Sequence, residues 1–98
     1  RQNMPEIRFR VRWPDGRTED CYSPSTIITE HLEVGTDYPL GQFLDKARDG
    51  LNAANERVRA RFGMGCAQAI NQIIAIEQRA ATYSGTPGST VRIEDFYQ

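Results

Sequence analysis

The fold is decided by residues 39–83, PLGQFLDKARDGLNAANERVRARFGMGCAQAINQIIAIEQRAATY, which alone carry a long helical apolar period. Apolar side chains recur there at steps of three and four, so each set falls on one side of an α-helix. The first set is Leu40, Phe43, Leu44, Ala47, Leu51, Ala54, Val58 and Phe62, and the second is Cys66, Ala69, Ile70, Ile73, Ile76, Ala80 and Tyr83. This pattern predicts two helices that meet at residues 61–66, and so short a turn makes them antiparallel neighbours.

Flanking residues indicate where the first helix begins and ends. Asp37 is expected to be the N-cap, Pro39 fits the first turn, and Gly63 is expected to be the C-cap. Gly50 costs about 1 kcal/mol relative to alanine inside a helix, so its position indicates close packing or a slight bend. The polar side of the second helix, expected opposite its apolar stripe, carries Gln68, Asn71, Gln72, Gln78 and Arg79.

Residues 6–13 alternate strictly between apolar and polar side chains, which is typical of a half-buried strand. The expected inner face carries Ile7, Phe9, Val11 and Trp13, and the outer face carries Arg8, Arg10 and Arg12. Pro14-Asp15-Gly16 has the chemistry of a tight turn and leads into a second strand at residues 17–23. The sequence therefore predicts a β-hairpin at the N-terminal end.

The register of this hairpin depends on its turn. A two-residue Asp15-Gly16 turn is disfavoured because Pro14 would then occupy a position whose N–H normally pairs across the strands. A three-residue loop with Gly16 in the left-handed conformation is preferred. That register pairs Arg10 with Asp20, Phe9 with Cys21 and Arg8 with Tyr22, and it leaves Glu19 opposite Val11, a mismatch that only an edge strand would tolerate.

Residues 24–32 are open to two interpretations. Ser23 and Pro24 are a helix-start signal, with Ser23 as the N-cap, and Ile28 and Leu32 then share one helical face. The β-branched run at residues 26–29 favours a strand instead. A short helix is the preferred interpretation, followed by a loop at residues 33–37.

A last strand is expected at residues 90–97, after a glycine- and proline-containing loop at residues 84–89, with Val91 and Ile93 facing the core. The predicted fold is an α+β two-layer sandwich of order β-β-(α)-α-α-β, in which a helical hairpin covers a small sheet. Residues 4–98 are expected to form this single domain. Residues 1–3 precede Met4 and are interpreted as an expression remnant, with an internal methionine at position 4 as the equal alternative.

Composition narrows the function classes. The chain of 98 residues has a net charge of −1, so no global field draws it to nucleic acid or to an anionic membrane. No apolar run approaches the roughly 20 residues of a transmembrane helix, and no signal peptide is recognised. We expect a soluble, cytoplasmic protein without nucleic-acid or membrane partners, whose Cys21 and Cys66 are free thiols, with one disulfide as the alternative.

The turn between the two helices gathers the candidate binding residues. Arg57 and Arg61 lie one helical turn apart near the C-terminal end of the first helix, and Gly63 and Cys66 follow. They are the candidate ligand- or partner-binding residues. The plainer interpretation is that arginines at a helix C-terminus complement the helix dipole. The arginine row of the first strand is likewise interpreted as a solvated face, because only Tyr22 is available there to stack on bases.

Cys66 is the candidate nucleophile, because the N-terminus of a helix favours a thiolate. His31 is the single histidine, and nothing in the sequence brings it near Cys66. A small buried cysteine in an apolar stripe is the plainer interpretation. We therefore predict no catalytic residue, metal site or cofactor.

Several short elements carry a family resemblance. They are residues 12–16 (RWPDG), 21–25 (CYSPS), 38–40 (YPL), 55–59 (NERVR), 62–66 (FGMGC) and 75–77 (AIE). In this order they resemble the small bacterial family of nitrogen starvation response proteins over about residues 4–80. The resemblance implies a gene cluster with a nitrilase, a radical-SAM protein, an acetyltransferase and a flavoprotein. It implies no assigned activity.

Three functions follow as hypotheses. The first is a non-catalytic accessory protein that binds an enzyme of its gene cluster, with a homodimer as a further interpretation. The second is a binder of small anions that uses Arg57, Arg61 and the Gly63–Cys66 turn. The third and least favoured is a Cys66-dependent enzyme.

Overall fold

The computed structural model describes residues 5–98, so the interpretation of residues 1–3 and of Met4 lies outside the described part of the chain. The elements in chain order are β1 (Ile7–Arg12), β2 (Thr18–Ser23), the 3-10 helix η1 (Thr26–Glu30), β3 (Asp37–Pro39), α1 (Leu40–Phe62), α2 (Ala67–Ala81) and β4 (Thr90–Tyr97). No helix within residues 5–98 has the length and apolar character needed to cross a lipid bilayer.

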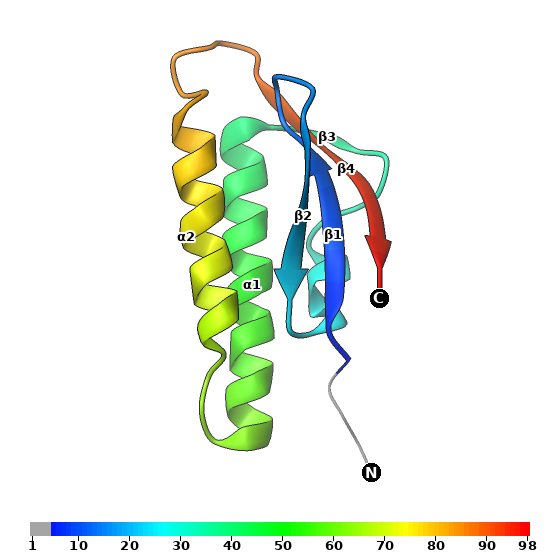
Figure 1. The fold of residues 1–98 in the computed structure, drawn as a ribbon, viewed down its shortest axis with the longest axis vertical. Helices are drawn as coiled ribbons and strands as arrows, with labels where there is room; N and C mark the ends of the chain where they lie inside the picture. Colours follow the sequence, from blue (N-terminus) through cyan, green and yellow to red (C-terminus); the bar gives the residue numbers. More distant parts are fainter. Residues whose placement is uncertain (1–4) are drawn as a thin grey trace.

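The four strands form one antiparallel sheet in the order β2-β1-β4-β3. The antiparallel helices α1 and α2 lie together on one side of this sheet (Figure 1). The predicted α+β architecture and the helical hairpin are therefore confirmed. The last strand takes its place beside β1, in the centre of the sheet, which the sequence did not decide.

The predicted hairpin register is confirmed. Gly16 has a φ of 87°, and the backbone N–H of Trp13 donates to the carbonyl of Arg17 at 2.8 Å. The register pairs Arg8 with Tyr22, Phe9 with Cys21, Arg10 with Asp20, and Val11 with Glu19. The structure also explains the mismatched Glu19, because β2 is an edge strand and the Glu19 carboxylate accepts a hydrogen bond from the Trp13 indole at 2.8 Å.

The core lies between the sheet and the helical hairpin. The sheet contributes Ile7, Phe9, Val11, Trp13, Cys21, Val91 and Ile93, and the long helices contribute Phe43, Ala47, Leu51, Ala54, Ala69, Ile76 and Ala80. Gly50 faces η1, where an added Cβ would lie 2.4 Å from Cδ1 of Ile28. Close packing, rather than a bend alone, is thus the reason for a glycine in this helix.

The predicted N-cap of the first long helix is wrong. Asp37 lies in β3, where its carboxylate accepts from Arg92 on β4 at 2.9 Å, so it is not available to cap α1. The N-cap is Pro39, which has no side chain that could cap, and the N–H of Leu40 donates to the carbonyl of Ser89 instead. The short strand β3 was missed because three residues are too few for a periodic pattern.

Ser23 is also not a helix cap. Its hydroxyl donates to the carbonyl of Ser25 at 2.7 Å, and Ser25 is the N-cap of η1, accepting from the N–H of Ile27 at 3.2 Å. Ser23 continues β2 instead, paired with Ile7. The segment that sequence left open is therefore a short 3-10 helix, which buries Ile28 despite its β-branched composition.

The apolar stripes are not buried along their full length. The helical hairpin extends past the end of the sheet (Figure 1), and Phe62, at the end of α1, is exposed. Ile70 on α2 is exposed too, although both residues belong to predicted stripes. Arg79 and Gln72, on the predicted polar side of α2, differ from the expectation in the opposite way, because neither side chain is directed only to solvent. Both side chains turn toward the β-hairpin, where Gln72 accepts a hydrogen bond from the N–H of Tyr22 and Arg79 forms an ion pair with Glu19.

Candidate functional site

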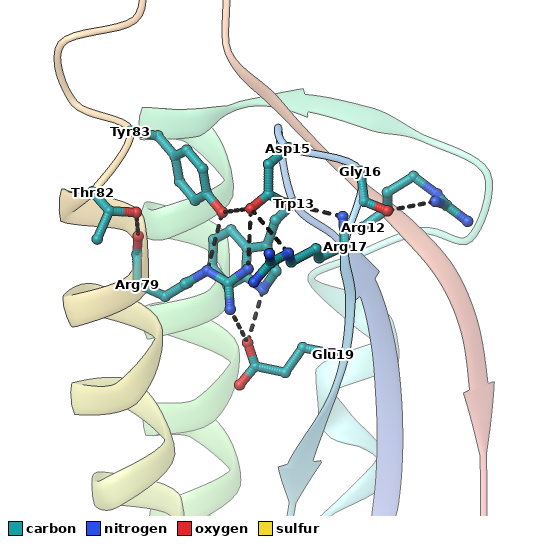
Figure 2. Close-up of polar contacts among 9 residues, drawn as sticks. All are labelled: Arg12, Trp13, Asp15, Gly16, Arg17, Glu19, Arg79, Thr82 and Tyr83. Carbon is teal, nitrogen blue, oxygen red and sulfur yellow. Dashed lines mark hydrogen bonds and ion pairs between the residues drawn. The ribbon is translucent and has the colours of Figure 1, made fainter.

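Polar and aromatic side chains join the turn of the β-hairpin to the C-terminal end of α2 (Figure 2). The Trp13 ring stacks on Tyr83 at 5.9 Å between centroids, and the Arg79 guanidinium lies over Trp13 at 5.4 Å. Arg79 donates to the Tyr83 hydroxyl at 3.0 Å, and that hydroxyl donates to Asp15 at 2.9 Å. Each side chain thus holds its neighbour in place.

This cluster is a structural connection rather than a reactive site. Trp13 is 1% exposed, so a substrate has no access to its ring. The backbone N–H of Arg17, followed by the Tyr83 hydroxyl, keeps the pKa of the Asp15 carboxyl below its ordinary value. A carboxylate held in its charged form by such partners is a poor proton donor or acceptor near neutral pH. The Trp-Pro-Asp-Gly element is therefore accounted for by the fold.

The turn between the helices is built on a buried asparagine. Asn55 is 8% exposed, and its side-chain oxygen accepts from the N–H of Cys66 at 2.6 Å. A Cβ at Gly65 would lie 2.7 Å from this same oxygen, so only glycine leaves room for the contact. Sequence reasoning missed the role of Asn55. The available signal was a polar residue directly after the buried stripe position Ala54.

Replacing Asn55 with alanine is expected to lower the free energy of unfolding by about 1–2 kcal/mol, because the N–H of Cys66 loses its acceptor. The loss should be local, so amide hydrogen exchange at Cys66 is expected to accelerate more than exchange in β1. Asn55→Asp keeps an acceptor and serves as the control. Equal protection of Cys66 in the wild type and in Asn55→Ala would contradict this role.

The four predicted binding residues have different surroundings in the structure. Gly63 and Cys66 share the turn, where Gly63 has a φ of 84° and closes α1 as predicted. The Arg57 guanidinium instead approaches the Ser25 hydroxyl at 3.4 Å, and the Arg61 guanidinium lies over the Phe62 ring. A shared anion site of these residues remains a prediction.

Cys66 is partly exposed, and its neighbour is a tyrosine rather than a histidine. Burial, followed by the adjacent Glu6 carboxylate, raises the pKa of Tyr22 to about 12, and the Cys66 thiol acts in the same direction. His31 packs against Gly50 near the middle of α1. Cys21 is buried, which raises the pKa of its thiol, and both cysteines are free.

A groove of about 270 Å³ lies between β2 and α2, and Tyr22 forms part of its wall. It is lined by Arg8, Tyr22, Gln68, Asn71, Gln72 and Ala75. The N–H of Tyr22 points to the open edge of β2 and donates to the side-chain oxygen of Gln72 at 2.9 Å. Sequence reasoning missed this groove, because only the folded chain brings α2 beside the edge of β2.

The side chains at these sites are mainly hydrogen-bonding groups. Within residues 5–98, no group of three or more histidine, cysteine, aspartate and glutamate side chains is placed to hold a metal ion.

The outer face of the sheet carries a second aromatic side chain besides Tyr22. The Arg10 guanidinium lies 5.3 Å from the centre of the Tyr97 ring, which corrects the expectation of a single aromatic side chain there.

Comparisons with known proteins agree with the resemblance seen in the sequence. The family described as nitrogen starvation-induced protein NitG matches residues 8–96, which extends the predicted range through β4. A search of curated proteins and a search of solved structures each find no match. Because the family covers nearly the whole described chain, the protein belongs to the family of the nitrogen starvation-induced protein NitG.

Proposed function

We propose that this member of the family is a non-catalytic accessory protein that binds a partner protein through the projecting end of its helical hairpin. The observation that supports this is the exposure of two large apolar side chains there: Phe62 is 59% exposed and Met64 is 71% exposed. Both belong to the hairpin end, defined here as Arg59, Arg61, Phe62 and Met64. It is the part of the hairpin that extends past the sheet (Figure 1).

Exposed apolar surface of this kind is what a partner would cover. Burial of apolar area contributes roughly 25 cal/mol per Å², and aromatic and methionine side chains are enriched at the centres of protein interfaces. Arg59, with a half-exposed side chain, stands beside these residues, and its Glu56 partner at 3.4 Å is itself exposed. The fitting partner surface is therefore an apolar depression with an acidic rim.

The partner proposed is an enzyme of the same bacterial gene cluster. The family resemblance implies a nitrilase, a radical-SAM protein, an acetyltransferase and a flavoprotein as candidates, and the shared compartment would be the cytoplasm. A second copy of the chain is the competing occupant.

The test uses the purified cluster enzymes one at a time. Isothermal titration calorimetry is expected to show that one of these enzymes binds the wild-type protein. The double variant Phe62→Ser/Met64→Ser is expected to weaken that binding at least tenfold, about 1.4 kcal/mol. Val34→Ser is the matched control, since Val34 is exposed too but lies in the loop beside β4. Its affinity should stay within about twofold.

Three results would contradict the proposal. The first is the absence of binding by every cluster enzyme, and the second is an equal loss of affinity in the hairpin-end variant and in Val34→Ser. The third is a dimer in sedimentation equilibrium that the hairpin-end variant converts to a monomer. That result would show that a second copy of the chain covers Phe62 and Met64.

A further inference from the structure

We propose that the groove between β2 and α2 is a binding site for a small monocarboxylate that also carries a neutral hydrogen-bonding group, such as an amide. The groove measures about 270 Å³, close to the lower end of the roughly 300–1,000 Å³ found for ligand pockets. Its lining combines one guanidinium, from Arg8, with three side-chain carboxamides. This site is independent of the hairpin end.

Arg8 differs from the other arginines of β1 in its partners. Arg10 donates to Asp20 at 2.8 Å and Arg12 donates to Glu94 at 2.6 Å. Within residues 5–98, Arg8 forms no ion pair, and its guanidinium instead lies 5.4 Å from the centre of the Tyr22 ring. A guanidinium held over an aromatic ring by a cation–π contact keeps N–H groups that can donate elsewhere, and two of them can bind one carboxylate.

The carboxamides of α2 supply the neutral half of the site. Gln72 is oriented by the N–H of Tyr22, which donates to its side-chain oxygen at 2.9 Å and leaves its amide N–H groups to donate elsewhere. Gln68 and Asn71 line the same groove on the exposed side of α2. Carboxamides both donate and accept, so they match an amide or hydroxyl group on a ligand.

The surrounding charges favour a single negative charge on the ligand. The Glu6 carboxylate adjoins the Tyr22 hydroxyl, and the Asp20 carboxylate is close enough to Arg8 to interact with its charge. Asp20 is already paired with Arg10, so the charges at the groove are the Arg8 guanidinium and the nearby Glu6 carboxylate. A dianion such as phosphate would meet more repulsion from Glu6 than a monocarboxylate would. Ligand class is thus set by one cation within a mostly neutral, hydrogen-bonding wall.

The experiment compares two probes that differ in one group, succinamate, with a carboxylate and an amide, and succinamide, with two amides. In a ¹⁵N-NMR titration at constant ionic strength, succinamate is expected to shift the backbone signals of Arg8, Tyr22 and Gln72 saturably, with a dissociation constant on the order of 1 mM. Succinamide should bind at least about tenfold more weakly, because it lacks the charge that Arg8 recognises.

Arg8→Gln is expected to weaken succinamate binding at least tenfold, about 1.4 kcal/mol, without disturbing the fold, because Arg8 is exposed. The matched control is Arg12→Gln, which removes the same charge four positions along the same strand and should change the affinity less than about twofold. The proposal is overturned by equal binding of the two probes, by equal effects of the two variants, or by no saturation at roughly ten times the expected dissociation constant. The variant with both Phe62→Ser and Met64→Ser should retain succinamate binding, which separates this test from that of the proposed function.

Discussion

Replacing Trp13 with alanine is expected to lower the free energy of unfolding by about 3–5 kcal/mol. Trp13 is almost fully buried and contacts three side chains of the helical hairpin: Phe43 on α1, at 5.7 Å and 82° between rings, Arg79 on α2, and Tyr83 just after α2. Removing the ring opens a cavity and leaves the Glu19 carboxylate without its indole donor. A loss of this size is a large fraction of the roughly 5–15 kcal/mol that stabilises a small domain.

Urea unfolding followed by far-ultraviolet circular dichroism is the suitable measurement, because Trp13 is the single tryptophan and its fluorescence disappears with the substitution. Trp13→Phe keeps part of the aromatic packing and should cost less than the alanine variant. Phe62→Ala, which truncates an exposed aromatic ring, should change the free energy by less than about 0.5 kcal/mol. A Trp13→Ala variant as stable as Phe62→Ala would refute the account of Trp13 as the connection between sheet and helices.

Substituting Gly50 with valine is expected to cost about 2–3 kcal/mol through overpacking. The Cβ alone would lie 2.4 Å from Cδ1 of Ile28 and 3.1 Å from Cβ of His31. Ile28 is fully buried, so its methyl group cannot swing into solvent to make room. The helix would have to move away from η1, although valine is intrinsically a better helix former than glycine.

Gly41 provides the matched control in the same helix. An added Cβ there meets no atom within 4 Å, so Gly41→Val should leave the stability unchanged or raise it by less than about 1 kcal/mol. Thermal unfolding of both variants, compared with the wild type, measures the difference. Similar melting temperatures for the two valine variants would show that the contact with Ile28 is not restrictive.

The elements that the sequence predicted well are those whose residues signal their structure locally. β1 alternates strictly, Pro14-Asp15-Gly16 permits one favoured turn, and the apolar period of α1 ends at a glycine with positive φ. In each case the residues that fix the conformation are neighbours in the chain or one helical turn apart. The register of the β-hairpin and the helical hairpin could therefore be predicted from the sequence.

Capping and site predictions depended on contacts that local patterns do not encode. Asp37 has the chemistry of an N-cap, yet its carboxylate accepts a hydrogen bond from Arg92 on β4, a strand far away in the sequence. Arg79 has the position of a solvated residue, yet the aromatic rings of Trp13 and Tyr83 lie against it. Of the candidate site, sequence identified the turn with Gly63 and Cys66, but neither the Asn55 contact that holds it nor the groove that contains Arg8.

The sequence by itself determined the two helices, the β-hairpin with its register, and the family, because periodicity, turn chemistry and ordered motifs are local properties of the chain. Tertiary structure alone decided that β4 lies between β1 and β3, and that the edge of β2 faces α2. It also decided that Phe62 and Met64 stay uncovered while Trp13 is enclosed. Each of these outcomes depends on the relative length and placement of whole elements, and long-range packing fixes both only when the chain is folded.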